Sequence, residues 1–357
     1  MRRPRFQSRP LIRSYKKDSK SKEIKSYLLD LSRKDIVLDY SQLRIGCFHF
    51  LSHALPKGST VATSCYTIFD MVNIIINAGH KPFFVDIDKD NLGPNIYQLI
   101  ELVNSKKVQA VIYTHLHGYK ANLTSLAKCC EEKNCILIED CAQSLWNPSW
   151  DKKCSVPGSY GDAAIYSTGF FKGINTICGG LLTFNKGENY SKEIVRAHKT
   201  LEMKFTFDFI YRTIYAVLFK IVTSDLFFNG ILFPVLKISW SKNFVWMNKR
   251  AREENNPRYI HREYFNILKM NPLQKLLLKF QSKIALDKDY YIKLNLSNIY
   301  LSELKGLIKK KIIYIPGVIE KKGDLTLEGI SSFNQIPMLS SRRKELLDYL
   351  ISEGFDI

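Results

Sequence analysis

The fold is decided by the stretch Ala163-Ala-Ile-Tyr-Ser-Thr-Gly-Phe-Phe-Lys-Gly-Ile-Asn-Thr-Ile-Cys-Gly-Gly-Leu-Leu-Thr183. It reads as an apolar strand, a turn that carries Lys172, and a glycine pair that opens a second strand. Phe170 and Phe171 flank the lysine. An apolar environment lowers the pKa of an amine, which would make Lys172 a usable nucleophile. The alternative for a single lysine of this kind is a solvated loop cation.

A second run, residues 135–143, reads as a buried strand that ends in the carboxylate of Asp140. Open α/β sheets place ligand-binding groups just beyond the carboxyl ends of their strands. A pyridoxal phosphate (PLP) enzyme needs a lysine amine for its Schiff base and a carboxylate that keeps the pyridine nitrogen protonated. Lys172 and Asp140 could supply these two groups, and the alternative is an ordinary ion pair between them.

Together these segments resemble the DegT/StrS family of sugar-nucleotide aminotransferases, which are PLP enzymes of fold type I. Residues 167–172 are similar to the family members that read S-F-G-x-G-K where others read S-F-H-x-x-K. The resemblance implies an α/β fold. Its large domain would hold a mixed, mostly parallel sheet flanked by helices, and a smaller, shortened α/β domain would follow at the C-terminal end.

Two further blocks occur in the order that the family shows. Residues 59–88 alternate strand, helix and strand, as doubly wound folds do, and residues 157–162 resemble the family's G-S-F-G-D turn. Ile68 stands where the family stacks an aromatic ring on the cofactor, and an aliphatic side chain can cover a ring face by dispersion. The matching positions of the first block are Tyr66, Thr67, Asn73, Ala78, Gly79, Pro82, Val85 and Asp86.

Residues 38–54 read as a turn that enters a helix, where the family presents backbone N–H groups to the cofactor phosphate. The family's Ser-Gly-Thr or Ser-Gly-Arg triplet is Gln42-Leu43-Arg44 in this chain, so only the arginine is kept. We expect Arg44 to bind the cofactor. Leu43 would then have to adopt whatever backbone geometry the family's glycine supplies.

The resemblance also assigns roles to single residues. Lys172 would form the Schiff base and carry the proton, Asp140 would hold the pyridinium, Gln143 would lie beside the cofactor's 3′-oxygen, and Ser167 would bind phosphate. The implied reaction transfers an amino group, most often from glutamate in this family, to a keto sugar linked to a nucleotide. The resemblance further implies that such products enter surface polysaccharides, including lipopolysaccharide. Lys172 matters because family members that dehydrate sugars have lost this lysine.

The histidine and cysteine pattern predicts no metal site. His115, at the end of the strand-like run 108–118, is expected to be a structural hydrogen-bonding residue rather than a catalyst. The eight cysteines include no C-x-x-C pair, and several lie in apolar runs. This pattern favours reduced core residues in a cytoplasmic protein.

The chain is strongly basic, with a net charge of +19. Residues 1–26 carry ten Lys or Arg against Asp18 and Glu23, and no apolar segment follows, which predicts a flexible basic arm rather than a secretory signal. This charge suits phosphorylated substrates or an anionic membrane face, and the alternative is a simple excess of solvated lysines. No nucleic-acid partner is expected, because no known nucleic-acid-binding signature occurs.

Three further parts follow the arm: a PLP-binding large domain (27–204), an apolar and basic insertion (205–255) and a C-terminal small domain (256–357). Residues 270–274 resemble the start of the helix that opens the family's small domain. Residues 336–350 read as a strand and a helix. The sequence ends earlier than family members usually do, so we expect the small domain to be incomplete.

The insertion is dense in aromatic and aliphatic side chains from Phe205 to Trp240. Its longest run without charge, residues 226–236, is about half the length of a membrane-spanning helix. Two readings stay open: a surface-seeking segment that docks on the cytoplasmic leaflet or a partner, and a helical hairpin buried against the core or a second subunit. Cations that would suit anionic headgroups follow: Lys242, Lys249, Arg250 and Arg252.

We expect a homodimer, because fold type I sites are shared across a twofold interface in the family. Two alternatives to the enzyme remain. One is a degenerate, inactive member that binds a membrane surface or a partner, indicated by Gln42-Leu43, Ile68 and Cys178, where the family often has Glu. The other is a non-enzymatic binder built on the basic arm.

Overall fold

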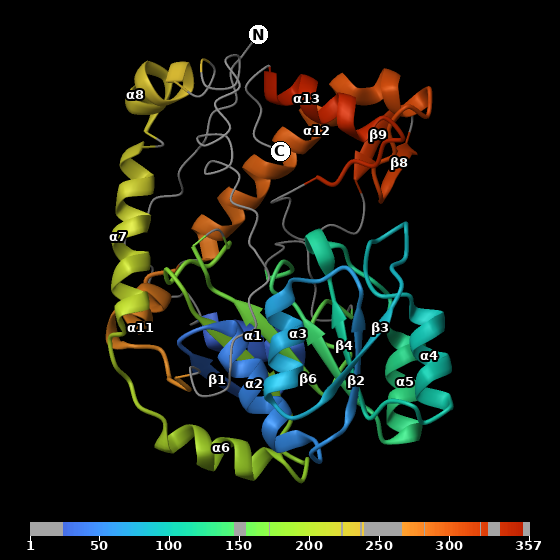
Figure 1. Cartoon of the computed structure of the whole chain (residues 1–357), viewed down its shortest axis with the longest axis vertical. Coiled ribbons are helices and arrows are strands. Elements are labelled where there is room, and N and C mark those ends of the chain that lie inside the picture. Colours follow the sequence, from blue (N-terminus) through green and yellow to red (C-terminus); the bar gives the residue numbers. More distant parts are fainter. Residues whose placement is uncertain are drawn as a thin grey trace.

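The computed structural model describes residues 24–145, 155–170, 172–222, 224–235, 238, 266–281, 283–321, 323–327 and 336–352. A seven-stranded sheet with helices packed on it forms the centre of this part of the chain (Figure 1). The predicted α/β class with a mixed, mostly parallel sheet is confirmed.

The strands of the sheet lie in the order β1-β7-β6-β5-β4-β2-β3. β7 is antiparallel to both of its neighbours, and every other pair is parallel. The carboxyl ends of the six remaining strands therefore meet at one edge, where β7 begins. The bounds are β1 Ile36–Tyr40, β2 Thr60–Ser64, β3 Lys81–Val85, β4 Ala110–Thr114, β5 Ile136–Asp140, β6 Ala163–Ser167 and β7 Gly180–Phe184.

Helices cover both faces of the sheet because its apolar side chains alternate between two cores. Val61 and Ile112 belong to one buried cluster, and their strand neighbours Ala62 and Tyr113 belong to another. The first cluster packs against α2, α3 and α6, and the second against α4 and α5. The helices before and within this unit are α1 Ile24–Ser32, α2 Leu43–Ala54, α3 Phe69–Asn77, α4 Ile96–Asn104, the 3-10 turn η1 Leu116–Gly118, α5 Thr124–Lys133 and α6 Ser191–Thr200.

β1 is a strand that the sequence prediction missed, since residues 38–54 read only as a turn and a helix. It pairs with β7 along its whole length, from Ile36 opposite Phe184 to Tyr40 opposite Gly180. Gly180 makes this approach possible, because a Cβ built on it would lie 2.3 Å from the Cα of Leu43. The glycine pair therefore brings the turn after β1 against the start of β7.

The C-terminal part combines helices with a two-stranded antiparallel sheet. Its elements are α11 Pro272–Lys279, α12 Lys283–Lys309, β8 Val318–Lys321, β9 Asp324–Leu327 and α13 Arg343–Ser352. α11 begins with a capping box, in which Asn271 and Gln274 satisfy each other's backbone N–H groups. The strand predicted near residue 336 is not formed: Leu339 makes a single bridge with Tyr314.

The described part of the insertion is helical. It contains α7 Phe207–Val222, the short α8 Asp225–Phe227 and a π-helical turn, η2 Phe228–Leu232. α7 stands at one side of the molecule, next to α11 at its lower end (Figure 1). Among the described residues, no helix has both the length and the apolarity to cross a bilayer.

The four-part division of the chain stays a prediction. Of the predicted basic arm (1–26), residues 1–23 lie outside the described residues and residues 24–26 belong to α1. The cations of the insertion, from Lys242 to Arg252, also lie outside the described residues. Seven of the eight cysteines lie within them and carry free thiols.

Candidate active site

The predicted site residues gather at the carboxyl edge of the sheet, on segments that follow different strands. Each segment leaves a strand of the same direction, so the topology brings these side chains to one side of the sheet. They are Arg44 after β1, Ile68 after β2, Asp140 and Gln143 at and after β5, and Ser167 and Lys172 at and after β6.

Asp140 is the last residue of β5 and is only 5% exposed. Its Oδ1 accepts a hydrogen bond from the Ala142 N–H at 3.0 Å, and its Oδ2 accepts a long one from the Thr114 hydroxyl at 3.4 Å. Burial raises the pKa of Asp140, while the Ala142 N–H and the charge of Lys172 act in the opposite direction. The carboxylate is therefore buried with acceptor capacity that these two hydrogen bonds leave unused.

Lys172 lies in the turn between β6 and β7 and is half-buried. Its backbone N–H donates to the Gly169 carbonyl at 3.0 Å. Asn175 holds the turn from inside, since its amide donates to the Phe170 carbonyl at 2.9 Å and its side-chain oxygen accepts from the Ile177 N–H at 2.8 Å. The positive charge of Lys172 lowers the pKa of Asp140, so the structure brings the two predicted groups within electrostatic reach.

Glu139, beside Asp140 on β5, is a residue that the sequence prediction missed. Its carboxylate accepts hydrogen bonds from the backbone N–H groups of Gly158, Tyr160 and Gly161 at 2.7–2.8 Å and from His115 Nε2 at 2.9 Å. Burial raises its pKa, but these donors outweigh burial and hold the pKa of Glu139 below its usual range. A buried-strand carboxylate followed by a glycine-rich turn was the signal that could have revealed it.

His115 takes the structural part that the sequence predicted, because its Nε2 is bound to Glu139 and its Nδ1 is buried without a hydrogen-bond partner. Ligand atoms of His115, Glu139 and Cys141 lie within 4.8 Å of one another. His115 and Glu139 are hydrogen-bonded to each other. Backbone N–H donors already point at the Glu139 oxygens and burial raises the pKa of the Cys141 thiol, so the chemistry of these groups disfavours a metal ion.

Gln143 and Ser167 both make local bonds at this edge. Gln143 Oε1 accepts the His117 N–H at 2.6 Å, which fixes His117 in a left-handed conformation with φ of 52°. Ser167 Oγ accepts the Gly169 N–H at 3.4 Å. Ile68 precedes α3 and is 64% exposed, so its side chain is accessible at the same edge.

Arg44 lies at the predicted phosphate turn, and its guanidinium has partners within the protein. Its Nη1 donates to Asp70 Oδ2 and its Nε to Gln42 Oε1, both at 2.5 Å. The guanidinium is therefore already ion-paired at the predicted phosphate turn. Gln42 is extended and Leu43 starts α2, and neither residue has a positive φ, so the missing glycine costs no backbone strain here.

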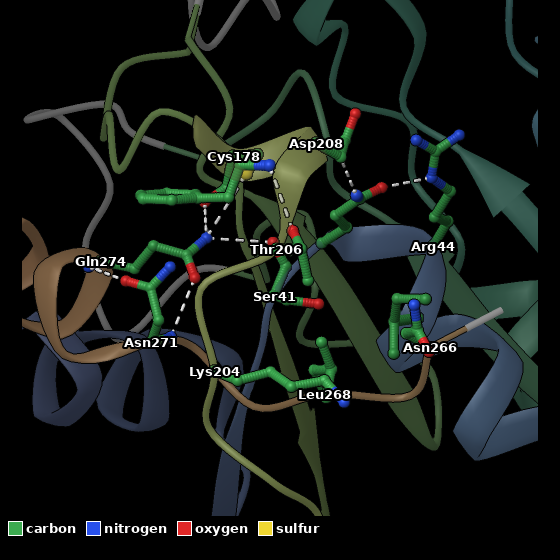
Figure 2. A pocket seen from close by; sticks show the side chains of 13 residues that line it. Ser41, Arg44, Cys178, Lys204, Thr206, Asp208, Asn266, Leu268, Asn271 and Gln274 are labelled. Atoms are coloured by element: carbon green, nitrogen blue, oxygen red, sulfur yellow. Dashed lines mark hydrogen bonds between the residues drawn. The ribbon is translucent and has the colours of Figure 1, made fainter. Parts of the chain in front are cut away.

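A cavity of about 210 Å³ opens beside Arg44, between the β1–α2 turn, the start of α7 and α11 (Figure 2). Gln274 of α11 ties the β1–α2 turn to the segment that precedes β7, since its side-chain amide donates to the carbonyls of Ser41 and Cys178. Asp208 of α7 lines the cavity and accepts a hydrogen bond from Gln42 at 3.1 Å. The insertion thus forms part of the cavity wall.

Residues 48–210 match the model of the DegT/DnrJ/EryC1/StrS aminotransferase family. Over these residues the chain belongs to that family. It is 30% identical to the GDP-perosamine synthase of Vibrio cholerae over 131 residues, 37% of this chain and 35% of that protein. It is 33% identical to the pleiotropic regulatory protein of Geobacillus stearothermophilus over 145 residues, 40% of this chain and 37% of that protein. These matches span little more than a third of the relatives' length.

Solved structures of this family share the fold over most of the chain. A DegT DnrJ EryC1 StrS aminotransferase from Brucella abortus superposes with a TM-score of 0.59 at 15% identity, over 93% of this chain and 72% of that one. The E. coli GDP-4-keto-6-deoxy-D-mannose-3-dehydratase, with bound hydrated PLP, gives a TM-score of 0.61 at 15% identity, over 94% and 77% of the two chains. The predicted PLP fold type I is confirmed.

Proposed function

We propose that this chain is a PLP-dependent aminotransferase that transfers an amino group to a keto sugar linked to a nucleotide. The observation that carries the proposal is the pair of Asp140 and Lys172 at the carboxyl edge of the sheet. A buried carboxylate with a raised pKa and few donors, beside a lysine in a strand-end turn, is typical of a functional site.

The residues present fit the cofactor. A carboxylate offers about four acceptor positions, and donors from the described part of the chain occupy only two of those of the buried Asp140. That leaves capacity for the protonated ring nitrogen of PLP. Ile68 would cover the ring, Gln143 would lie near the 3′-oxygen, and Ser167 would bind the phosphate. Arg44 fits less well, because Asp70 already neutralises it.

When bound, PLP supplies an electron sink for the carbon from which a proton is removed. Asp140 would hold a proton on the ring nitrogen at its buried oxygens. Lys172 would bind the cofactor through Nζ and then move the proton at that atom. The Asn175 hydrogen bonds would fix the turn that carries this amine. The presence of a lysine at position 172 favours amination as the reaction of this chain. The E. coli structural neighbour is named as a dehydratase.

The family relatives support the substrate class in coarse terms only. GDP-perosamine synthase and dTDP-4-dehydro-2,3,6-trideoxy-D-glucose 4-aminotransferase are sugar-nucleotide enzymes. We propose glutamate as the amino donor and a surface glycan, such as lipopolysaccharide, as the destination of the product. We further propose that the protein is a cytoplasmic homodimer, for which sedimentation equilibrium is the direct measurement.

The proposed function is tested by absorbance. Purified protein supplied with PLP should absorb visible light, and adding glutamate should shift the spectrum because the amino group moves to the cofactor. Adding a keto-sugar nucleotide should then reverse the shift. A colourless protein, or a spectrum that no amino donor changes, would instead support the inactive family member.

A further inference from the structure

α7 carries an apolar surface that faces away from the described protein. Eight of its sixteen residues are large apolar side chains with exposed fractions between 45% and 92%. Isolated exposed apolar residues are ordinary, but a continuous row on one helix marks an interaction surface. The eight residues, here called the α7 apolar face, are Phe207, Ile210, Tyr211, Ile214, Tyr215, Val217, Leu218 and Ile221.

The α7 apolar face contains no charge. At about 100° per residue, its members fall within an arc of about 160° on the helix. The charged residues of α7, which are Asp208, Arg212 and Lys220, fall on the remaining side. α7 is therefore amphipathic: its charged residues, of which Asp208 and Lys220 are exposed, lie outside the apolar arc.

Contacts on the inner side explain this orientation. Phe209 and Ala216 are the only buried side chains of α7, and Phe209 joins Ile177, Cys178 and Leu277 in a small core cluster. Asp208 pairs with Arg212 at 2.8 Å. These contacts leave the outer arc uncovered, which contradicts the reading of the segment as a hairpin buried against the core of its own described domain.

The apolar surface continues beyond α7 into a strongly basic sequence. Leu226, Ile231, Val235 and Ile238 are all exposed, with fractions between 44% and 91%. Lys242 follows Ile238 by only four positions in the sequence. Further cations come next in the sequence: Lys249, Arg250 and Arg252.

We propose that the α7 apolar face, with the exposed side chains of Leu226, Ile231, Val235 and Ile238, docks on an anionic lipid bilayer and lies in its interface. Charge selects this occupant. An anionic leaflet attracts a chain with a net charge of +19 at long range. A helix with a charge-free outer face and neighbouring cations suits the boundary between headgroups and acyl chains.

Docking would place the cavity near the membrane surface. Asp208 and Phe209, in the first turn of α7, line the cavity together with Arg44. The helix that contacts lipid is therefore also a wall of that cavity (Figure 2). This proposal does not depend on the aminotransferase assignment, since vesicle binding is measured without turnover.

The test is co-sedimentation of the full chain with vesicles of phosphatidylcholine, with and without phosphatidylglycerol, at low and high salt. Wild type should sediment with anionic vesicles at low salt, and high salt should weaken this binding. The double variant Ile214→Gln/Leu218→Gln should lose affinity for anionic vesicles by about tenfold or more, because two apolar side chains no longer enter the interface.

A matched control lies on another helix. Leu296 and Ile299 on α12 are of the same residue types and are similarly exposed, at 48% and 52% against 54% and 55% for Leu218 and Ile214. The variant Leu296→Gln/Ile299→Gln should bind vesicles like wild type. Equal losses in the two double variants would overturn the assignment to α7.

A second variant tests the charge. Changing Lys242, Lys249, Arg250 and Arg252 to Gln should weaken binding to anionic vesicles and reduce its salt dependence. The proposal is overturned if wild type does not sediment with anionic vesicles at low salt. It is also overturned if the Ile214→Gln/Leu218→Gln variant still binds them fully but halves the mass of the protein in light scattering, since a second copy of the chain would then be the occupant.

Discussion

Glu139 and Asp140 are adjacent carboxylates at the end of one strand, yet their environments are opposite. Glu139 is completely buried and accepts four hydrogen bonds, which hold its pKa below the usual range. Asp140 is almost as buried but accepts one good bond and one long one, and its pKa is raised by burial.

The difference separates a carboxylate that holds the fold from one that is left for chemistry. The Glu139 hydrogen bonds tie β5 to the turn at residues 158–161 and to His115. Asp140 costs the protein stability because it is buried with few partners. A protein can retain such a destabilising buried carboxylate where a ligand supplies the missing hydrogen-bond partner. We therefore assign the functional role to Asp140 and the structural role to Glu139.

The largest expected effect is that of Glu139→Gln on stability. The variant removes the buried charge and places a donor, the amide N–H₂ group, against the N–H donors that now bind the Glu139 carboxylate. We therefore expect the free energy of unfolding to fall by about 3 kcal/mol or more. Urea unfolding followed by circular dichroism measures this change. A loss below about 0.5 kcal/mol would show that Glu139 is not the structural carboxylate.

Asp140→Asn should act in the opposite way. Turnover should fall about a hundredfold, or about 2.7 kcal/mol in the activation free energy, because the ring nitrogen loses its carboxylate. The free energy of unfolding of the cofactor-free protein should rise, on the order of 1 kcal/mol, because the buried charge is removed. Steady-state kinetics and urea unfolding test the two parts. A variant with wild-type turnover and lower stability would reverse the roles of the two carboxylates.

The pH dependence sharpens the comparison further. The raised pKa of Asp140 stabilises the folded state fully only below its unfolded pKa, near 4, and this contribution is lost as pH rises through the folded value. The lowered pKa of Glu139 contributes stability above about pH 4, which is lost as pH falls through the folded value.

Unfolding of cofactor-free protein at several pH values measures both contributions. The advantage of Asp140→Asn over wild type should appear only above about pH 4, by on the order of 1 kcal/mol. The disadvantage of Glu139→Gln should shrink at more acidic pH. Parallel pH profiles for the two variants would contradict the opposite pKa directions.

The smallest effect is expected at Arg44. Asp70 already pairs with the Arg44 guanidinium, so Arg44→Gln should weaken PLP binding only about threefold. An arginine without a carboxylate partner would contribute more through a charge-assisted hydrogen bond to the phosphate. Asp70→Asn should strengthen PLP binding by releasing the cation. Fluorescence titration with PLP measures both affinities. A loss of a hundredfold in Arg44→Gln would mean that the arginine leaves Asp70 when the cofactor binds.

The sequence predicted much of the large domain because its signals are local. Apolar strand runs, the turn at residues 157–162 and the order of strand and helix gave the α/β class and the positions of Asp140 and Lys172 along the chain. β1 escaped prediction because the residues it pairs with in β7 are 140 to 148 positions away in the sequence, and its short run of five residues carries Asp39.

Tertiary contacts account for the remaining misses. The pairing of Arg44 with Asp70 and the four bonds to Glu139 join residues that no spacing rule connects. The aromatic content of α7 could not show which of its faces is covered, because that depends on the position of a few inner residues such as Phe209. Local patterns identify elements, whereas the burial of a charge or of an apolar face depends on what folds against it.

The central claim is that Lys172 carries the cofactor beside Asp140. Borohydride reduction of the PLP-loaded protein, followed by peptide mass mapping, should place the reduced cofactor on the peptide that contains Lys172. Lys172→Ala should lose this label entirely. A reduced cofactor on another lysine, or one retained by Lys172→Ala, would contradict the account.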